Sequence, residues 1–166
     1  MQNKIGRNFE KRWAKKSSSK VTIGSGNLWF DKEDCKNSNW LFQTKATKKD
    51  VYSLNLNDIV KLKQNAKKTK RDWAFVIEFQ AEHVIHSTCF VILPLRTLVL
   101  SPKTCVKYSV DMVKKPVNKQ ISLKREALDD SWLEDRLFAF KFRDNQEVLV
   151  AVQEVDFLRI FEKSLF

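Results

Sequence analysis

Asp34, Gln43 and Lys45 have the residue types and spacing of a phosphodiester-cleaving centre. Gln43 follows Asp34 by nine residues, and Lys45 follows Gln43 by two. Carboxylate and amide oxygens are ligands for Mg²⁺, which activates water, while a lysine stabilises charge that develops on a phosphate. Glu10 can add a second carboxylate. These residues therefore predict metal-assisted hydrolysis.

A strand over residues 40–47 must position two of these side chains. The run is rich in aromatic and β-prone residues with a period of two, which puts Gln43 and Lys45 on one face and Thr44 with the apolar residues on the other. A cluster of turn-forming residues separates this strand from Asp34. A hairpin is therefore expected to bring Asp34 beside Gln43 and Lys45.

An amphipathic helix over residues 3–16 should carry Glu10. Ile5, Phe9 and Trp13 recur every four residues and form an apolar stripe. Glu10 lies at the border between this stripe and a basic face. We therefore expect it to point along the edge of the sheet.

A glycine-containing loop supplies further candidates. Two of the three glycines of the chain fall in Gly24-Ser25-Gly26-Asn27, which indicates either close approach to a phosphate or an ordinary turn. The expected substrate contacts are Ser25, Lys11, Asn27, Thr47 and Lys48.

The order Glu10, Ser25-Gly26, Asp34, Gln43-x-Lys45 resembles the PD-(D/E)xK nuclease superfamily, and within it the archaeal and phage Holliday-junction resolvases. The resemblance covers residues 4–80. It implies a Mg²⁺-dependent, structure-selective DNA endonuclease that accepts Mn²⁺ and acts on branched DNA as a homodimer. It also implies that Glu10, Asp34 and Gln43 bind the metal, that Lys45 is catalytic, and that Ser25 lies near the scissile phosphate.

Two positions depart from the usual pattern of that superfamily. Glu33 stands where a proline is usual, and Gln43 stands where most members have a metal-binding glutamate. The Asp…Gln-x-Lys pattern is similar to that of Mrr-type restriction endonucleases. Two alternatives stay open: a non-catalytic nucleic-acid-binding protein with a degenerate nuclease fold, and a restriction-type nuclease that cuts linear duplex DNA.

The charge distribution favours a nucleic-acid partner. The 166-residue chain has a net charge of +11: residues 1–125 hold 26 Lys/Arg against 10 Asp/Glu, and residues 126–166 hold 5 against 10. Clustered cations bind polyanions by releasing counterions. Three cysteines without a CxxC motif, and no signal peptide or membrane-spanning run, predict a cytoplasmic protein. The resemblance adds a phage origin, with action in the host cytoplasm.

The expected fold is α/β, with a central mixed β-sheet flanked by helices as in restriction endonucleases, and a β-rich C-terminal extension. The strand–helix–strand order supports a core over residues 1–102, and Pro and Lys mark a linker over 101–118 before the extension, 103–166. Residues 137–142 resemble residues 74–79, so a partial duplication is an open alternative.

Overall fold

The computed structural model describes residues 4–22, 34–81, 88–99, 109–112, 116–143 and 145–162. The helices are α1 (Lys4–Lys16), α2 (Leu56–Thr69), α3 (Leu95–Val99), α4 (Arg125–Leu133) and α5 (Glu154–Ile160). The strands are β1 (Lys20–Val21), β2 (Cys35–Lys36), β3 (Trp40–Thr47), β4 (Val51–Asn55), β5 (Asp72–Phe79), β6 (Thr88–Pro94), β7 (Ser109–Met112), β8 (Gln120–Lys124), β9 (Arg136–Phe142) and β10 (Asn145–Gln153).

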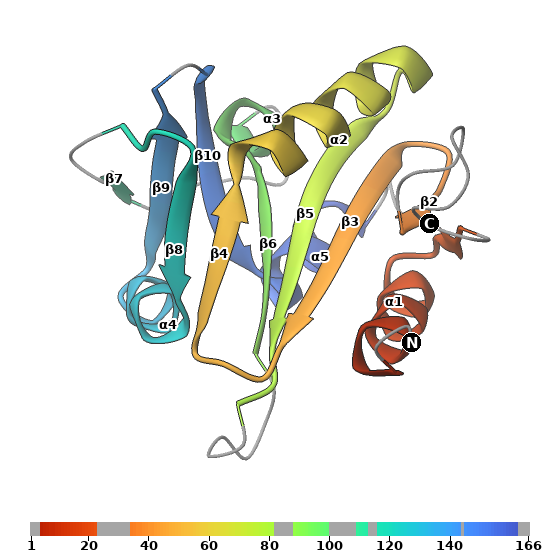
Figure 1. Ribbon diagram of the computed structural model, residues 1–166, viewed down its shortest axis with the longest axis horizontal. Helices are drawn as coiled ribbons and strands as arrows, with labels where there is room; N and C mark the ends of the chain where they lie inside the picture. The colour runs from red at the N-terminus through yellow and green to blue at the C-terminus, as the bar shows by residue number, and fades with distance from the viewer. Residues whose placement is uncertain are drawn as a thin grey trace.

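One mixed sheet runs through the molecule (Figure 1). Among the described residues it has eight strands in the order β1-β2-β3-β5-β6-β10-β9-β7, and β4 and β8 form a separate antiparallel pair. β3 lies parallel to β5, and β7 lies parallel to β9. In the run β5, β6, β10 and β9, each strand is antiparallel to the next. The fold is therefore α/β with a central mixed sheet, as the sequence predicts.

Helices α1, α3 and α5 cover one face of the sheet. Trp13 of α1 and Phe157 of α5 are fully buried against this face, where they meet Trp40 and Phe42 of β3. Side chains from both ends of the chain thus share one core. Because burial of aromatic side chains is a large stabilising term, this core fixes α1 and α5 on β3.

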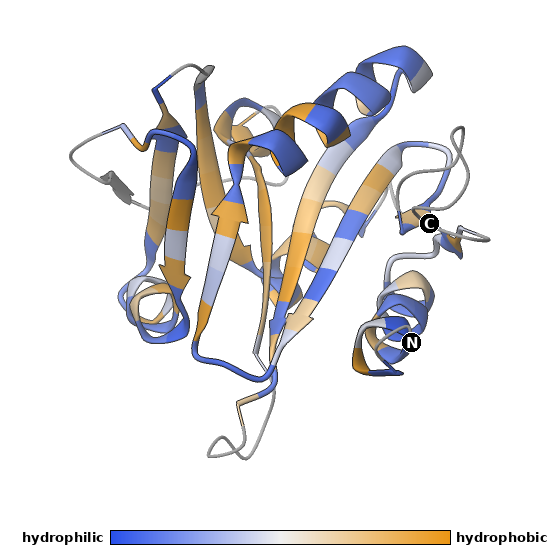
Figure 2. Ribbon diagram, viewed as in Figure 1, coloured by the Kyte–Doolittle hydropathy of each residue, from blue (hydrophilic) through white to orange (hydrophobic). Residues whose placement is uncertain are grey.

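The other face is covered by α2, α4 and the β4–β8 pair (Figures 1 and 2). Leu54 of β4 and Leu123 of β8 are fully buried in a second cluster, together with Ile59 of α2 and Leu128 of α4. In Figure 2 the central strands are largely hydrophobic, whereas much of the visible surface of α2 is hydrophilic. The pattern is that of a sheet buried on both faces.

The predicted local elements agree with the structure in the first half. The helix expected over residues 3–16 is α1, and the strand expected over 40–47 is β3. Residues 109–112 differ: they lie in the stretch predicted to be a linker, yet they form β7. The partner of β7 is β9, which is distant in sequence, so composition gave no signal for this pairing.

The sheet also continues across the domain boundary predicted after residue 102. β6 precedes that boundary and β10 follows it, and Leu93 pairs with Val150 at the junction. Both residues are fully buried in the same apolar cluster. The two halves of the chain therefore share one sheet and one core.

Candidate active site

The hairpin expected between Asp34 and Gln43 is present. β2 pairs with β3 in an antiparallel register, Cys35 opposite Phe42. Asn37 forms the turn, because its Oδ1 accepts hydrogen bonds from the backbone N–H groups of Asn39 (2.9 Å) and Trp40 (2.8 Å). The turn residues thus place Asp34 beside Gln43.

Asp34 is held in a single orientation. Its side chain is buried, and Oδ2 accepts hydrogen bonds from Gln43 Nε2 (2.6 Å), the backbone N–H of Thr44 (2.8 Å) and Thr44 Oγ1 (3.1 Å). These three donors fix the position of the carboxylate relative to β3.

Thr44 is the residue of this site that the sequence pattern did not identify. Strand alternation placed Thr44 with the apolar side chains, and it is indeed buried. Its hydroxyl nevertheless reaches Asp34, because Asp34 lies just before β2, where its side chain turns toward β3. A threonine in an otherwise apolar strand face was the only available signal.

Glu10 lies in the electrostatic field of Asp34 and Lys45. Partial burial raises the pKa of Glu10, the negative charge of Asp34 raises it further, and the positive charges of Lys45 and Arg7 lower it. The backbone carbonyl of Glu10 also accepts a hydrogen bond from Cys35 Sγ at 3.5 Å. The structure thus joins Gln43 to Asp34 by a hydrogen bond and places Glu10 within the electrostatic influence of Asp34 and Lys45.

The thiol of Cys35 is also influenced by the negative charges of Asp34 and Glu10. Burial, followed by the charges of Asp34 and Glu10, raises the pKa of the Cys35 thiol to about 12. The negative charges of Asp34 and Glu10 form an environment that a divalent cation can neutralise. Cys35 therefore carries no charge at physiological pH.

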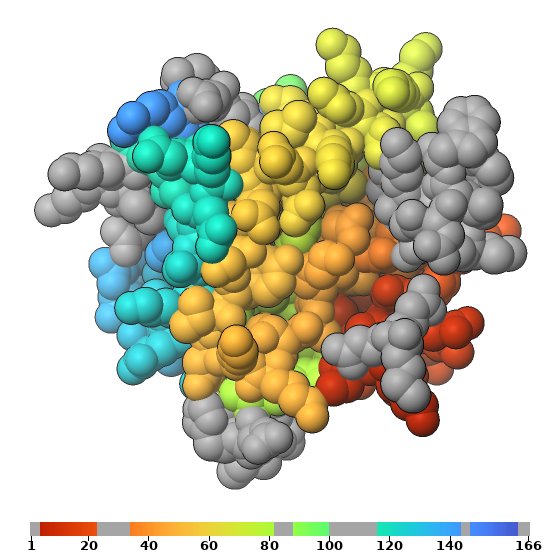
Figure 3. Space-filling view, viewed as in Figure 1, coloured from red at the N-terminus to blue at the C-terminus, as the bar shows by residue number. Residues whose placement is uncertain are grey.

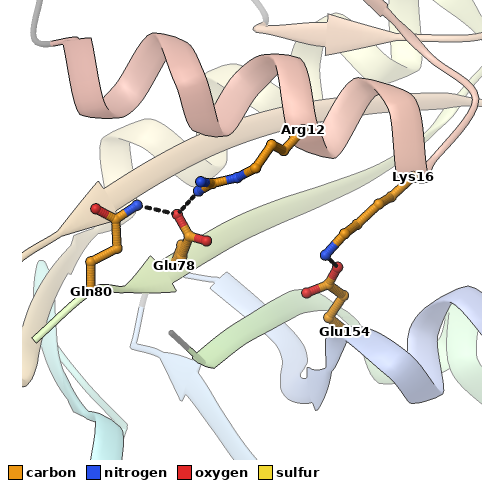
Figure 4. A network of polar contacts seen from close by, with 5 residues as sticks. All are labelled: Arg12, Lys16, Glu78, Gln80 and Glu154. Atoms are coloured by element: carbon orange, nitrogen blue, oxygen red, sulfur yellow. Dashed lines mark hydrogen bonds and ion pairs between the residues drawn. The ribbon is translucent and has the colours of Figure 1, made fainter. Parts of the chain in front are cut away.

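Two ion pairs hold α1, and with it Glu10, against the sheet (Figure 4). Arg12 Nη2 lies 2.5 Å from Glu78 Oε2 of β5, a buried carboxylate that also accepts a hydrogen bond from Gln80. Lys16 pairs with Glu154, the first residue of α5. The contacts lie on the side of α1 that faces the sheet and α5, so they fix the rotation of the helix.

Aromatic packing supports the same placement. The Trp13 ring meets that of Phe42 at 5.4 Å between centroids, and Phe157 lies 6.0 Å from Trp13 and 6.2 Å from Phe42. Edge-to-face and tilted rings at such distances are favourable. The residue that follows Phe42 is Gln43, so this packing also fixes the part of β3 that carries the site.

The remaining predicted contacts are distributed around this centre. Lys11, Lys45 and Lys48 are exposed, and Thr47 is half-buried at the end of β3, where its Oγ1 accepts a hydrogen bond from Lys49 N at 3.1 Å. The predicted phosphate contacts Ser25 and Asn27 lie outside the described residues.

The exposed lysines of α1, α2 and the β3–β4 segment are together called the basic surface. Residues of α1 and α2 and of the β3–β4 segment reach the surface on one face of the molecule (Figure 3). Exposed cations on these elements are Lys11, Lys45, Lys48, Lys49, Lys61, Lys67 and Lys68. Such a surface can contact phosphates along a nucleic-acid backbone.

Asp34, Glu10 and Gln43 carry oxygen atoms of the kind that Mg²⁺ binds. Asp34 and Glu10 offer carboxylate oxygens, and Gln43 offers its amide oxygen because Nε2 is the atom that donates to Asp34. Within the described ranges, no three residues among His, Cys, Asp and Glu form a metal-binding group. The candidate set instead combines two carboxylates with an amide.

Comparison of the chain with protein-family models, with curated proteins and with solved structures gave no match. No helix in the described part of the chain is long and apolar enough to cross a membrane.

Proposed function

We propose that the protein is a Mg²⁺-dependent DNA endonuclease that hydrolyses phosphodiester bonds, with branched DNA as its preferred substrate. The observation that supports the proposal is the hydrogen bond from Gln43 to the buried Asp34 carboxylate, together with the influence of the Asp34 and Lys45 charges on Glu10. The exposed lysines of the basic surface support a nucleic-acid substrate. The preference for branched DNA comes from the resemblance to Holliday-junction resolvases.

Each residue of the centre has a distinct role. Asp34, Glu10 and the Gln43 amide oxygen would hold the ion, which supplies activation of water and stabilisation of charge on the phosphate when bound. Lys45 projects from the same strand as Gln43 and stabilises the negative charge of the transition state. Thr44 and Gln43 fix the Asp34 carboxylate through their hydrogen bonds.

The second candidate is a nucleic-acid-binding protein without cleavage activity. It is favoured by Gln43, which brings no negative charge to the centre and donates its amide to Asp34. In that case the two carboxylates would be retained for structure, and the basic surface would be the functional one.

The deciding experiment is cleavage of a labelled four-way junction beside a linear duplex of the same sequence, with Mg²⁺, Mn²⁺ or EDTA. We expect metal-dependent nicks on the junction that are lost in Asp34→Ala. Cutting of the linear duplex at preferred sequences would identify a restriction-type nuclease. Salt-sensitive binding without cleavage under either metal would establish the non-catalytic alternative.

A further inference from the structure

The two halves of the chain repeat the same order of elements. β3, β4, α2, β5, β6 and α3 are followed by β7, β8, α4, β9, β10 and α5. In each half the first strand lies parallel to the third, and the third lies antiparallel to the fourth. From its centre outward the sheet reads β6-β5-β3 on one side and β10-β9-β7 on the other (Figure 1).

Reciprocal backbone hydrogen bonds give the residue correspondence. Leu56 begins α2 and its N–H donates to the carbonyl of Lys119 at 2.8 Å, while Arg125 begins α4 and its N–H donates to the carbonyl of Asp50, also at 2.8 Å. Asp50 lies as far before Leu56 as Lys119 lies before Arg125. Each half thus donates to the other half the same backbone hydrogen bond that it accepts from it.

The axis of this symmetry passes through two residue pairs. With the starts of α2 and α4 as reference, Ser53 corresponds to Ser122, and these two residues face each other in the β4–β8 pair. With the starts of α3 and α5 as reference, Ile92 corresponds to Ala151, and these also face each other, in the β6–β10 pair. A residue that faces its own counterpart marks a twofold axis.

Matching backbone contacts also occur at the ends of β5 and β9. Thr47 lies opposite Phe79 and accepts a hydrogen bond from Gln80 N at 2.7 Å. In the second half Val117 lies opposite Phe142 and accepts a hydrogen bond from Arg143 N, again at 2.7 Å. Phe79 and Phe142 are both buried.

The segment with Glu10 and Asp34 is the part of the candidate centre that is not repeated. Gln43 pairs with Phe75, and its counterpart by register is Asp111, which pairs with Phe138. Residues 100–108, which connect α3 to β7, are fewer than the 13 residues of α1 alone, so no counterpart of the segment with Glu10 and Asp34 fits between the halves.

We infer that residues 109–160 are a catalytically silent second copy of the unit formed by residues 40–99, and that this copy takes the place of a partner subunit. One chain is then a complete particle with a single cutting centre, and it nicks one strand per bound DNA. The single nick rests on the proposed nuclease function. The replacement of a partner rests on the strand register alone.

The first part of the test is the mass of the particle, free and bound to a four-way junction in Ca²⁺. We expect the mass of one chain, 19.5 kDa, for the free protein and one chain per junction in the complex. A stable dimer in either state would overturn the inference, and it would leave the proposed nuclease function untouched.

The second part is cleavage of a supercoiled plasmid that carries an extruded inverted repeat. We expect nicked circles to accumulate before linear product. When Lys45→Met protein is added with DNA in excess, so that the two proteins do not compete for sites, the rate of nicking by the wild type should be unchanged. Linear product without a nicked intermediate, or slower linearisation caused by the mixed variant, would overturn the single-centre inference. Absence of cleavage with every metal would overturn the nuclease function and the single nick with it, while the particle mass still decides whether the second half replaces a partner.

Discussion

At the scale of single residues, the two carboxylates of the candidate centre have different surroundings. The Asp34 carboxylate accepts hydrogen bonds from Gln43 and Thr44, whereas burial and the charge of Asp34 raise the pKa of Glu10. Functional sites commonly hold ionisable groups in such unfavourable states. The two carboxylates should therefore respond differently to neutral substitutions.

Lys45→Met tests the proposed catalytic cation, with Lys48→Met as the matched control. Both lysines are exposed, so neither change should unfold the protein. Loss of a group that stabilises transition-state charge should lower the single-turnover cleavage rate by roughly 10²- to 10³-fold for Lys45→Met. Lys48→Met should only weaken DNA binding and reduce its salt dependence, by about one unit of slope. Equal rates for the two variants would remove Lys45 from the mechanism.

Glu10→Gln should raise the melting temperature at neutral pH in the absence of divalent metal. The pKa of Glu10 is higher in the folded protein than the ordinary 4.5, so the folded state binds this proton more readily than the unfolded state does. The ionised side chain therefore costs stability as pH rises through its folded pKa, and the difference between the proteins should vanish below the ordinary pKa.

Mg²⁺ should reverse the order of the melting temperatures of the wild type and Glu10→Gln. A ligand that binds only the folded state stabilises it, so wild-type protein should gain melting temperature with Mg²⁺ and Glu10→Gln should gain little. Cleavage by the wild type should also fall on acidification at a pH above the ordinary glutamate pKa, because protonated Glu10 cannot bind the ion. An equal Mg²⁺ response in both proteins would exclude Glu10 as a ligand.

At the scale of elements, the position of α1 decides whether Glu10 can contribute to the candidate centre. The helix touches the sheet through Phe9 and Trp13, and the ion pairs of Arg12 and Lys16 prevent it from rotating about its axis. Glu10 lies between these contacts. Loss of one ion pair should therefore act on catalysis as well as on stability.

Arg12→Met and Glu78→Gln form a double-mutant cycle that measures this anchor. Arg12→Met leaves the buried Glu78 carboxylate without its guanidinium partner, and should destabilise the fold by about 1–3 kcal/mol in urea unfolding. Glu78→Gln removes the buried charge itself, so the double variant should be less destabilised than the sum of the single changes.

The same variants should raise the Mg²⁺ concentration required for half-maximal cleavage more than they lower the maximal rate, because α1 carries the proposed ligand Glu10, whereas the proposed catalytic Lys45 lies on β3. Lys15→Met, on the exposed side of α1, is the control and should change neither quantity. Strict additivity in the cycle, with unchanged metal dependence, would mean that α1 is held by apolar packing alone.

At the scale of the whole molecule, the second half completes the core of the first. Phe157 of α5 is fully buried between Trp13, Trp40 and Phe42, and the central pair β6–β10 joins the halves. A shared core of this kind predicts cooperative unfolding of the entire chain.

Phe157→Ala should destabilise the protein by about 3–5 kcal/mol, the usual cost of a large cavity at an aromatic core position. Tryptophan fluorescence, which is dominated by first-half residues, and far-UV circular dichroism should shift together to the same lower denaturant midpoint. Leu133→Ala, at a position 71% exposed in the second half, should leave the midpoint unchanged. Separate transitions for the two signals would show that the halves fold independently.

The sequence by itself determined the local pieces of the site. Helical periodicity identified α1 and the border position of Glu10, and strand alternation with turn chemistry around Asn37 identified the hairpin that joins Asp34 to Gln43. These features depend on residues close in the chain, whose spacing can be read directly. The α/β class with a mixed sheet followed from the order of the same elements.

Only the tertiary structure decided how these pieces are held and what the second half is. The partners of Arg12 and Lys16 lie 66 and 138 residues away along the chain, and β7 pairs with a strand that composition did not connect to it. The facing of Ser53 and Ser122 likewise appears only in the register of β4 and β8. Long-range pairing depends on complementary surfaces formed during folding, and local periodicity carries no information about which distant surface each element will meet.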